Sequence, residues 1–212
     1  VLALGYRGDY IKNYFYNVRM TSSDFTLDMK PEGNLEFHNR KEDSSWEITF
    51  VDTGLDTLKG GRIKRLEPYI DGDLFHLTYG DGVSNIDIDK LHRFHLSHDK
   101  TGTLTAVRPP SRFGEILLDG DSVRSFTEKP QLHTGYINGG FFVFDRDFLD
   151  NLSTDEGCDF EFGPLEDLAE KGQLKAFKHD DFWQCMDNVR EKDYINKLWE
   201  EKKAPWNLEG GY

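Results

Sequence analysis

Short apolar runs alternate with amphipathic stretches along this chain of 212 residues. Short apolar runs bounded by glycine, proline or aspartate are typical of strands, and apolar residues recurring every three or four positions are typical of helices. The expected strands lie at 1–5, 25–29, 35–38, 46–51, 74–79, 102–107, 116–118, 123–126, 141–144 and 174–177. The expected helices lie at 9–18, 60–69, 88–98, around 148–149, 164–172 and 189–202. This alternation predicts an α/β protein with a mostly parallel sheet.

Composition narrows the possible functions. The net charge of −13 argues against binding to nucleic acid or to an anionic membrane, because no excess of cations is present to displace counterions. No apolar run approaches the roughly 20 residues that span a bilayer. Cys158 and Cys185 form no Cys-x-x-Cys pair and no disulfide framework, so a reducing cytoplasm is the expected compartment.

Three glycine-containing loops follow expected strands, where ligands bind in open α/β sheets. They are Asp52-Thr-Gly54 with Gly60-Gly-Arg62, Tyr79-Gly-Asp-Gly82, and Trp183-Gln-Cys-Met-Asp187. The Asp81 carboxylate, between Gly80 and Gly82, could hold Mg²⁺ against phosphate oxygens. The same spacing also suits an aspartate that only caps a turn, so both interpretations stay open on this feature alone.

Other polar motifs allow similar pairs of interpretations. Glu128-Lys-Pro130 could bind sugar hydroxyls and phosphate, or form a solvated charge pair. Asn138-Gly-Gly140 allows a ligand to approach the backbone, or marks a bulge. Arg108 and Arg112 flank a rigid turn and suit phosphate binding, although exposed arginine is common.

Two further patterns suggest metal sites but have simpler explanations. His92, His95 and His98 lie at three-residue spacing, yet the third turns away from the first and no carboxylate or cysteine completes a set. We therefore expect solvated helix histidines. Asp71-Gly-Asp73 has the Asp-x-Asp pattern of metal-dependent glycosyltransferases, but it precedes its strand, and we expect a turn there.

The ordered set of these motifs resembles the sugar-1-phosphate nucleotidyltransferases, closest to their cytidylyl branch, the glucose-1-phosphate cytidylyltransferases. The segments that carry the resemblance are Val51-Asp-Thr-Gly54, Gly60-Gly-Arg62, Tyr79-Gly-Asp-Gly82, Arg112-Phe-Gly114, Glu128-Lys-Pro130, Asn138-Gly-Gly-Phe-Phe142, Trp183-Gln-Cys-Met-Asp187 and Lys203-Ala-Pro-Trp206. The resemblance covers essentially the whole chain and implies a three-layer Rossmann-like fold.

The resemblance implies Mg²⁺-dependent transfer from CTP to glucose 1-phosphate, giving CDP-glucose and pyrophosphate for polysaccharide synthesis. Asp81, Lys129 and Asp187 would be catalytic, with Asp81 and Asp187 as the metal ligands. The substrate-binding residues would be Thr53, Gly61, Arg62, Gly80, Arg112, Gly114, Glu128, Asn138 and Gly139. A homo-oligomer is expected from the family.

Two departures from the family pattern stand out. The strand, Gly-rich loop and following helix that open the family are absent, so we expect 1–212 to be a single nucleotidyltransferase domain lacking that start. The branch usually has proline where Cys185 stands, and we do not interpret Cys185 as a nucleophile. Two alternatives remain open: a thymidylyl- or uridylyltransferase acting on a sugar 1-phosphate, and a non-catalytic module that binds a nucleotide sugar.

Overall fold

The computed structural model describes residues 1–30, 32–38, 46–109, 115–127 and 135–207. The chain folds into two compact units, each described here by itself. One unit comprises Val1–Ile70 and Leu149–Pro164, and the other comprises Asp71–Phe148 and Leu165–Tyr212. No helix in the described ranges is both long and apolar enough to cross a membrane.

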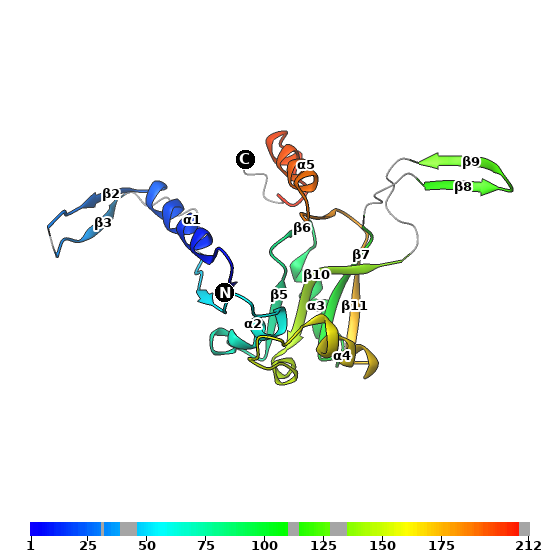
Figure 1. The fold of residues 1–212 in the computed structure, drawn as a ribbon, viewed down its shortest axis with the longest axis horizontal. Coiled ribbons are helices and arrows are strands. Elements are labelled where there is room, and N and C mark those ends of the chain that lie inside the picture. The colour runs from blue at the N-terminus through cyan, green and yellow to red at the C-terminus, as the bar shows by residue number, and fades with distance from the viewer. Residues whose placement is uncertain (31, 39–45, 110–114, 128–134, 208–212) are drawn as a thin grey trace. The chain divides into compact units, whose positions relative to one another are not determined.

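A four-stranded sheet forms the centre of the second unit (Figure 1). Its order is β11 (Leu174–His179), β7 (Gly102–Val107), β10 (Ile137–Asp145) and β5 (Leu74–Thr78). β11 runs parallel to β7, and β10 runs antiparallel to both β7 and β5. Three of these four strands therefore run in the same direction, which confirms the mostly parallel α/β prediction.

The core of this unit lies along β10. Phe142, Val143 and Phe144 are almost completely buried, as expected for a strand covered on both faces. The Phe144 ring stacks on Phe148 with centroids 4.1 Å apart. A Cβ atom at Gly102 would lie 2.8 Å from the Phe144 ring, so glycine permits this close packing.

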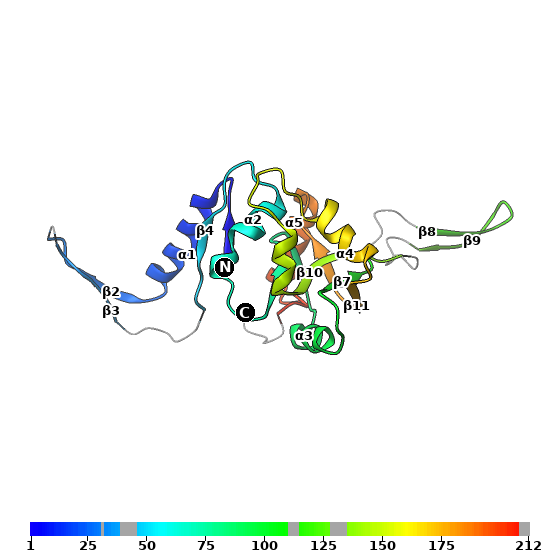
Figure 2. The same ribbon diagram turned by 90° about the horizontal axis from the view of Figure 1, so that it is seen from below.

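Helices lie on both faces of this sheet, which gives the three layers expected from the resemblance. Figure 2 shows α3 (Ile88–Leu96) on one face and α4 (Glu166–Glu170) on the other. Asp87 caps α3 by accepting the Lys90 N–H, as an N-cap aspartate does. The remaining elements of this unit are β6 (Gly82–Ser84), β8 (Glu115–Asp119), β9 (Ser122–Thr127), β12 (Trp183–Cys185) and α5 (Val189–Glu200).

The first unit contains a parallel pair, β1 (Leu2–Leu4) with β4 (Phe50–Asp52). Its other elements are α1 (Gly8–Thr21), β2 (Asp24–Leu27), β3 (Leu35–His38), α2 (Lys59–Arg65) and the short helix η1 (Glu67–Tyr69). Two further short helices, η2 (Arg146–Asn151) and η3 (Glu161–Leu165), cross the boundaries of the units along the chain.

Several elements begin or end at other residues than the sequence pattern predicts. The helix expected over 9–18 is α1, which begins at Gly8 after Arg7 in a left-handed conformation, so Asp9 lies in its first turn. The helix expected over 60–69 divides into α2 and η1, because Pro68 lacks an N–H. The helix expected from Pro164 begins at Glu166, after a kink at which Gly163 has a φ of 101°.

The prediction of solvated histidines on α3 is wrong for His95. Its side chain is 3% exposed, and its ring nitrogens lie 2.9 Å from Thr103 Oγ1 and 3.2 Å from an Asp145 oxygen. His98 also contacts Thr103 Oγ1, at 2.8 Å. His92 stacks against His76 of β5, and their facing nitrogens are 3.1 Å apart. Hydrogen-bond partners on the sheet make burial of the His95 imidazole tolerable.

Candidate functional site

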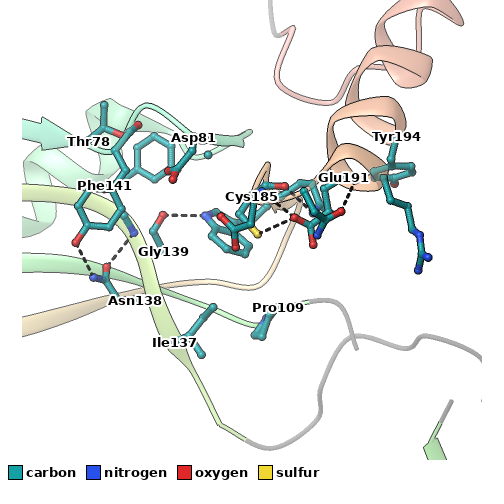
Figure 3. A pocket seen from close by; sticks show the side chains of 18 of the residues that line it. Thr78, Asp81, Pro109, Ile137, Asn138, Gly139, Phe141, Cys185, Glu191 and Tyr194 are labelled. Atoms are coloured by element: carbon teal, nitrogen blue, oxygen red, sulfur yellow. Dashed lines mark hydrogen bonds between the residues drawn. The ribbon is translucent and has the colours of Figure 1, made fainter. Parts of the chain in front are cut away.

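A cavity of about 1540 Å³ lies at one end of the sheet in the second unit (Figure 3). It is lined by the ends of β5 and β10, by the β12 strand and the turn after it, and by the first residues of α5. A volume of this size is ample for a ligand larger than a single sugar, since small-molecule pockets commonly occupy about 300–1,000 Å³. The cavity contains both predicted metal-binding aspartates in its lining, Asp81 and Asp187.

Asp81 reaches this cavity because β5 ends at Thr78, and the next strand, β6, begins at Gly82. The Tyr79 N–H donates to the Gly140 carbonyl at 3.1 Å, which holds the end of β5 against β10. Asp81 is exposed, and Figure 3 shows it beside the end of β5. Its carboxylate is therefore accessible to a ligand.

Asp187 approaches the same cavity from β12, which pairs antiparallel with β6. Cys185 is the register partner of Gly82, so the loops that carry Asp81 and Asp187 leave the same end of this two-stranded ribbon. Neither aspartate is buried. Two carboxylates on neighbouring strand ends, both facing one cavity, form a donor set suited to a hard divalent cation.

The turn that carries Asp187 is held by the start of α5. Asn188 is the N-cap, and its side chain accepts the Glu191 N–H at 3.1 Å. The Glu191 carboxylate accepts the Asp187 N–H at 2.9 Å. Ser, Thr, Asp or Asn followed three residues later by Glu is the capping-box spacing, and these contacts make α5 a variant of it. This feature was missed in the sequence, although the Asn188-x-x-Glu191 spacing could have revealed it.

Cys185 also belongs to this cluster. Burial, followed by the charges of Glu191 and Asp187, raises the pKa of the Cys185 thiol to about 11. The thiol is therefore protonated at neutral pH, and only a thiolate is a good nucleophile. This supports the expectation that Cys185 is not a nucleophile.

Asn138 and Gly139 lie on the opposite side of the cavity, at a bulge in β10. The Asn138 side chain accepts the Gly140 N–H at 2.9 Å and donates to the Tyr79 hydroxyl at 3.3 Å. The indole N–H of Trp183 donates to the Gly139 carbonyl at 2.8 Å. These contacts, which sequence analysis missed, tie the bulge to β5 and β12.

Both glycines at the bulge are required by their surroundings. A Cβ atom at Gly139 would lie 2.7 Å from a Val107 methyl group. Gly140 has a φ of +76°, where side chains are rarely tolerated, and its Cβ would lie 2.8 Å from the Tyr79 ring. The bulge therefore depends on both glycines.

Thr53, Gly61 and Arg62 belong to the first unit, where Thr53 and Arg62 share a hydrogen-bond network. The Thr53 hydroxyl, fully buried, donates to the Leu4 carbonyl at 2.8 Å. Arg62 donates through its Nη1 atom to Thr53 Oγ1 and the Gly54 carbonyl, both at 2.8 Å. These contacts stabilise the loop after β4. The binding roles of these residues remain predictions.

Of the remaining predicted site residues, only Gly80 lies within the described part of the chain. Gly80 lies in the loop between Tyr79 and Asp81, with open space where a Cβ would point. Arg112, Gly114, Glu128 and Lys129 lie outside the described residues. Their predicted roles in binding the sugar phosphate remain predictions.

The chain belongs to the nucleotidyl transferase family, whose model matches residues 62–187. It is 44% identical over 207 residues to the glucose-1-phosphate cytidylyltransferase of Salmonella typhi, covering 97% of this chain and 79% of that protein. A probable glucose-1-phosphate cytidylyltransferase of Bacillus subtilis (strain 168) is 36% identical over 208 residues, covering 98% of this chain and 80% of that protein. Among solved structures, HddC from Yersinia pseudotuberculosis superimposes with a TM-score of 0.61 at 20% identity, covering 93% of this chain and 77% of that one, and so supports the fold.

Proposed function

We propose that this nucleotidyltransferase transfers the cytidylyl group of CTP to glucose 1-phosphate, giving CDP-glucose and pyrophosphate. One observation carries the proposal: the Asp81 and Asp187 loops open onto a single cavity, on a chain 44% identical to a protein named for that activity. The sugar phosphate would attack the α-phosphorus of CTP, and pyrophosphate would leave.

The carboxylates of Asp81 and Asp187 fit a divalent cation, and we infer that Mg²⁺ is the ion they hold. When bound, the ion would offset the charge of the nucleotide phosphates, because hard cations prefer oxygen ligands. The exposure of both carboxylates supports this inference, since neither needs to move through packed side chains to meet a ligand.

The side chains around the cavity need to position the reactants more than to transfer protons. A sugar phosphate is ionised at neutral pH, so it requires no general base to become a nucleophile. Asn138 and Gly139, held by Tyr79 and Trp183, would orient the sugar. Lys129 would pair with its phosphate, and Glu128 would accept its hydroxyls, as the family resemblance implies.

Base selectivity is the first test of this function. The protein is assayed for pyrophosphate release with glucose 1-phosphate and each of CTP, UTP, dTTP, GTP and ATP. An unpaired buried donor or acceptor costs about 1–3 kcal/mol, so CTP should exceed the others in kcat/KM by roughly tenfold or more. Equal or faster turnover of dTTP or UTP would instead identify the thymidylyl- or uridylyltransferase alternative. Saturable CDP-glucose binding without pyrophosphate release from any nucleotide would identify a binding module.

The metal assignment has its own test. Asp81→Asn and Asp187→Asn should each lower kcat/KM by about a hundredfold or more, because each removes an anionic ligand of the divalent cation. Asp73→Asn is the matched control, since Asp73 is an exposed aspartate in the turn before β5. Near-normal turnover by Asp81→Asn would exclude Asp81 as a metal ligand.

Two further expectations, one from the family and one from the cysteines, remain proposals. We propose a homo-oligomer, as the family resemblance implies. We also propose a reducing cytoplasmic location, which the two free cysteines support.

A further inference from the structure

We propose that Glu191 is a positioning residue for the metal ligand Asp187. This inference rests on the proposed function, because it takes Asp187 to hold the divalent cation. Glu191 would act through the backbone of Asp187 without touching the cation itself. Its carboxylate would fix the turn between β12 and α5, so that the Asp187 side chain meets the cation from one preset direction.

The contacts of Glu191 favour this role. It occupies the first turn of α5, is partly buried, and lines the cavity with Asp187. Its Oε2 atom accepts the Asp187 N–H at 2.9 Å and lies 3.8 Å from the Cys185 sulfur (Figure 3). One carboxylate oxygen thereby contacts both residues 185 and 187. Charge-assisted hydrogen bonds of this kind are stronger than neutral ones and restrict the geometry more.

The opposite end of Glu191 is fixed as well. Its own N–H donates to the Asn188 side chain at 3.1 Å, so the residue is anchored to the helix at its backbone and to the turn at its carboxylate. Without the carboxylate, the Asp187 N–H would lose this partner. Freedom in the Asp187 backbone would then weaken cation binding, because partners behind metal ligands commonly contribute tenfold to a hundredfold in affinity.

An alternative is that Glu191 itself ligates the cation. Donor atoms of Cys185, Asp187 and Glu191 all lie within 4.8 Å of one another. However, Oε2 of Glu191 faces the Asp187 N–H. Replacing Glu191 with Gln distinguishes the positioning role from the ligand role. A Gln side-chain carbonyl can accept the same N–H, whereas a neutral amide is a much poorer cation ligand than a carboxylate.

The experiment measures the dissociation constant of Mn²⁺ alone by electron paramagnetic resonance of the free ion. Mn²⁺ replaces Mg²⁺ because both prefer carboxylate oxygen. Glu191→Ala should raise this constant about tenfold. Glu191→Gln should weaken binding by no more than about threefold, because the hydrogen bond to Asp187 is retained although it is no longer charge-assisted. KM for Mg²⁺ should follow the same order in the turnover assay.

Two controls separate positioning from simpler effects. Glu200→Ala removes one negative charge from the exposed far end of the same helix and should leave Mn²⁺ binding unchanged. Asn188→Ala removes the backbone anchor of Glu191 but keeps the contact of its carboxylate with Asp187. It should therefore lower thermal stability and weaken Mn²⁺ binding by less than about threefold, compared with about tenfold for Glu191→Ala. Equal weakening by Asn188→Ala and Glu191→Ala would indicate general fraying of the helix and overturn the proposal.

The remaining outcomes each lead to a definite conclusion. Equal loss of Mn²⁺ affinity in Glu191→Gln and Glu191→Ala would make Glu191 a direct ligand and overturn the positioning role. Unchanged affinity in Glu191→Ala, alongside weakened binding in Asp187→Asn, would overturn it while leaving the metal assignment intact. Unchanged affinity in Asp187→Asn would refute the metal assignment itself, and this inference with it.

Discussion

Replacing Trp183 with Phe tests the hydrogen bond that ties β12 to the bulge in β10. The indole N–H donates to the Gly139 carbonyl at 2.8 Å, and Gly139 is buried. Phe retains an aromatic ring but has no donor, so the carbonyl loses this partner. An unsatisfied buried acceptor costs about 1–3 kcal/mol, so we expect the free energy of unfolding to fall by about 1–2 kcal/mol.

The same substitution should affect sugar binding more than nucleotide binding. The bulge holds Asn138 and Gly139, which the proposed function places against glucose 1-phosphate. If about 1 kcal/mol of the loss appears in binding, KM for glucose 1-phosphate rises about fivefold. KM for CTP should change by less than about twofold, because the proposed function assigns the bulge to the sugar and not to the nucleotide.

Urea denaturation and steady-state kinetics measure the two effects. The matched control is Trp46→Phe, since Trp46 is 77% exposed and its free energy of unfolding should change by no more than about 0.5 kcal/mol. Equal stability of Trp183→Phe and Trp46→Phe would show that the hydrogen bond to the bulge does not stabilise the protein. A larger change in KM for CTP than for glucose 1-phosphate would refute the functional part of the reasoning.

Three further predictions concern the bulge, acid stability and the sugar phosphate. Gly140→Ala should lower the free energy of unfolding by about 1–3 kcal/mol, because Gly140 has a positive φ. The loss should exceed that of Gly120→Ala, since Gly120 also has a positive φ but has open space around it. Equal losses of unfolding free energy in the two variants would exclude crowding at the bulge. Burial and neighbouring imidazoles lower the pKa of His76 and His98 below 6.5, so the folded chain binds fewer protons and Tm should fall as the pH drops from about 7 toward 5. A flat Tm over that range, or one unaffected by His76→Asn, would contradict this. Lys129→Ala should weaken glucose 1-phosphate binding more than CTP binding in titration calorimetry, and the reverse order would refute its role.

The central strands could be predicted because burial leaves a clear pattern in the sequence. The segment 141–144 reads as a continuous apolar run, since both faces of β10 are covered, and β7 was expected at its observed bounds. By contrast, β6 and β12 are three-residue strands that pair across about a hundred residues of sequence. No local pattern could reveal that pairing, although it brings the Asp81 and Asp187 loops to one cavity.

The sequence predicted which residues line the cavity better than it predicted their hydrogen-bond partners. Asp81, Asn138, Gly139 and Asp187 were named together, and all four line the cavity. Their hydrogen-bond partners could not be inferred, because these depend on strands that meet only in the folded chain. His95 shows the same difficulty: its spacing on α3 does not indicate that Thr103 and Asp145 supply partners beneath it.

The short β6–β12 ribbon also has a consequence for how the cavity that contains Asp81 and Asp187 is completed during folding. Gly82 and Cys185 are paired, although more than a hundred residues separate them. Asp81 and Asp187 therefore come together only after the chain between β6 and β12 has folded into a closed loop. Closing such a loop carries an entropic cost that local structure does not offset. A partly synthesised chain that ends before β12 would therefore contain Asp81 but would lack both Asp187 and the strand that pairs with β6. If Asp81 and Asp187 hold a divalent cation as proposed, cation binding would report completed assembly of this unit and could serve as a probe of its folding.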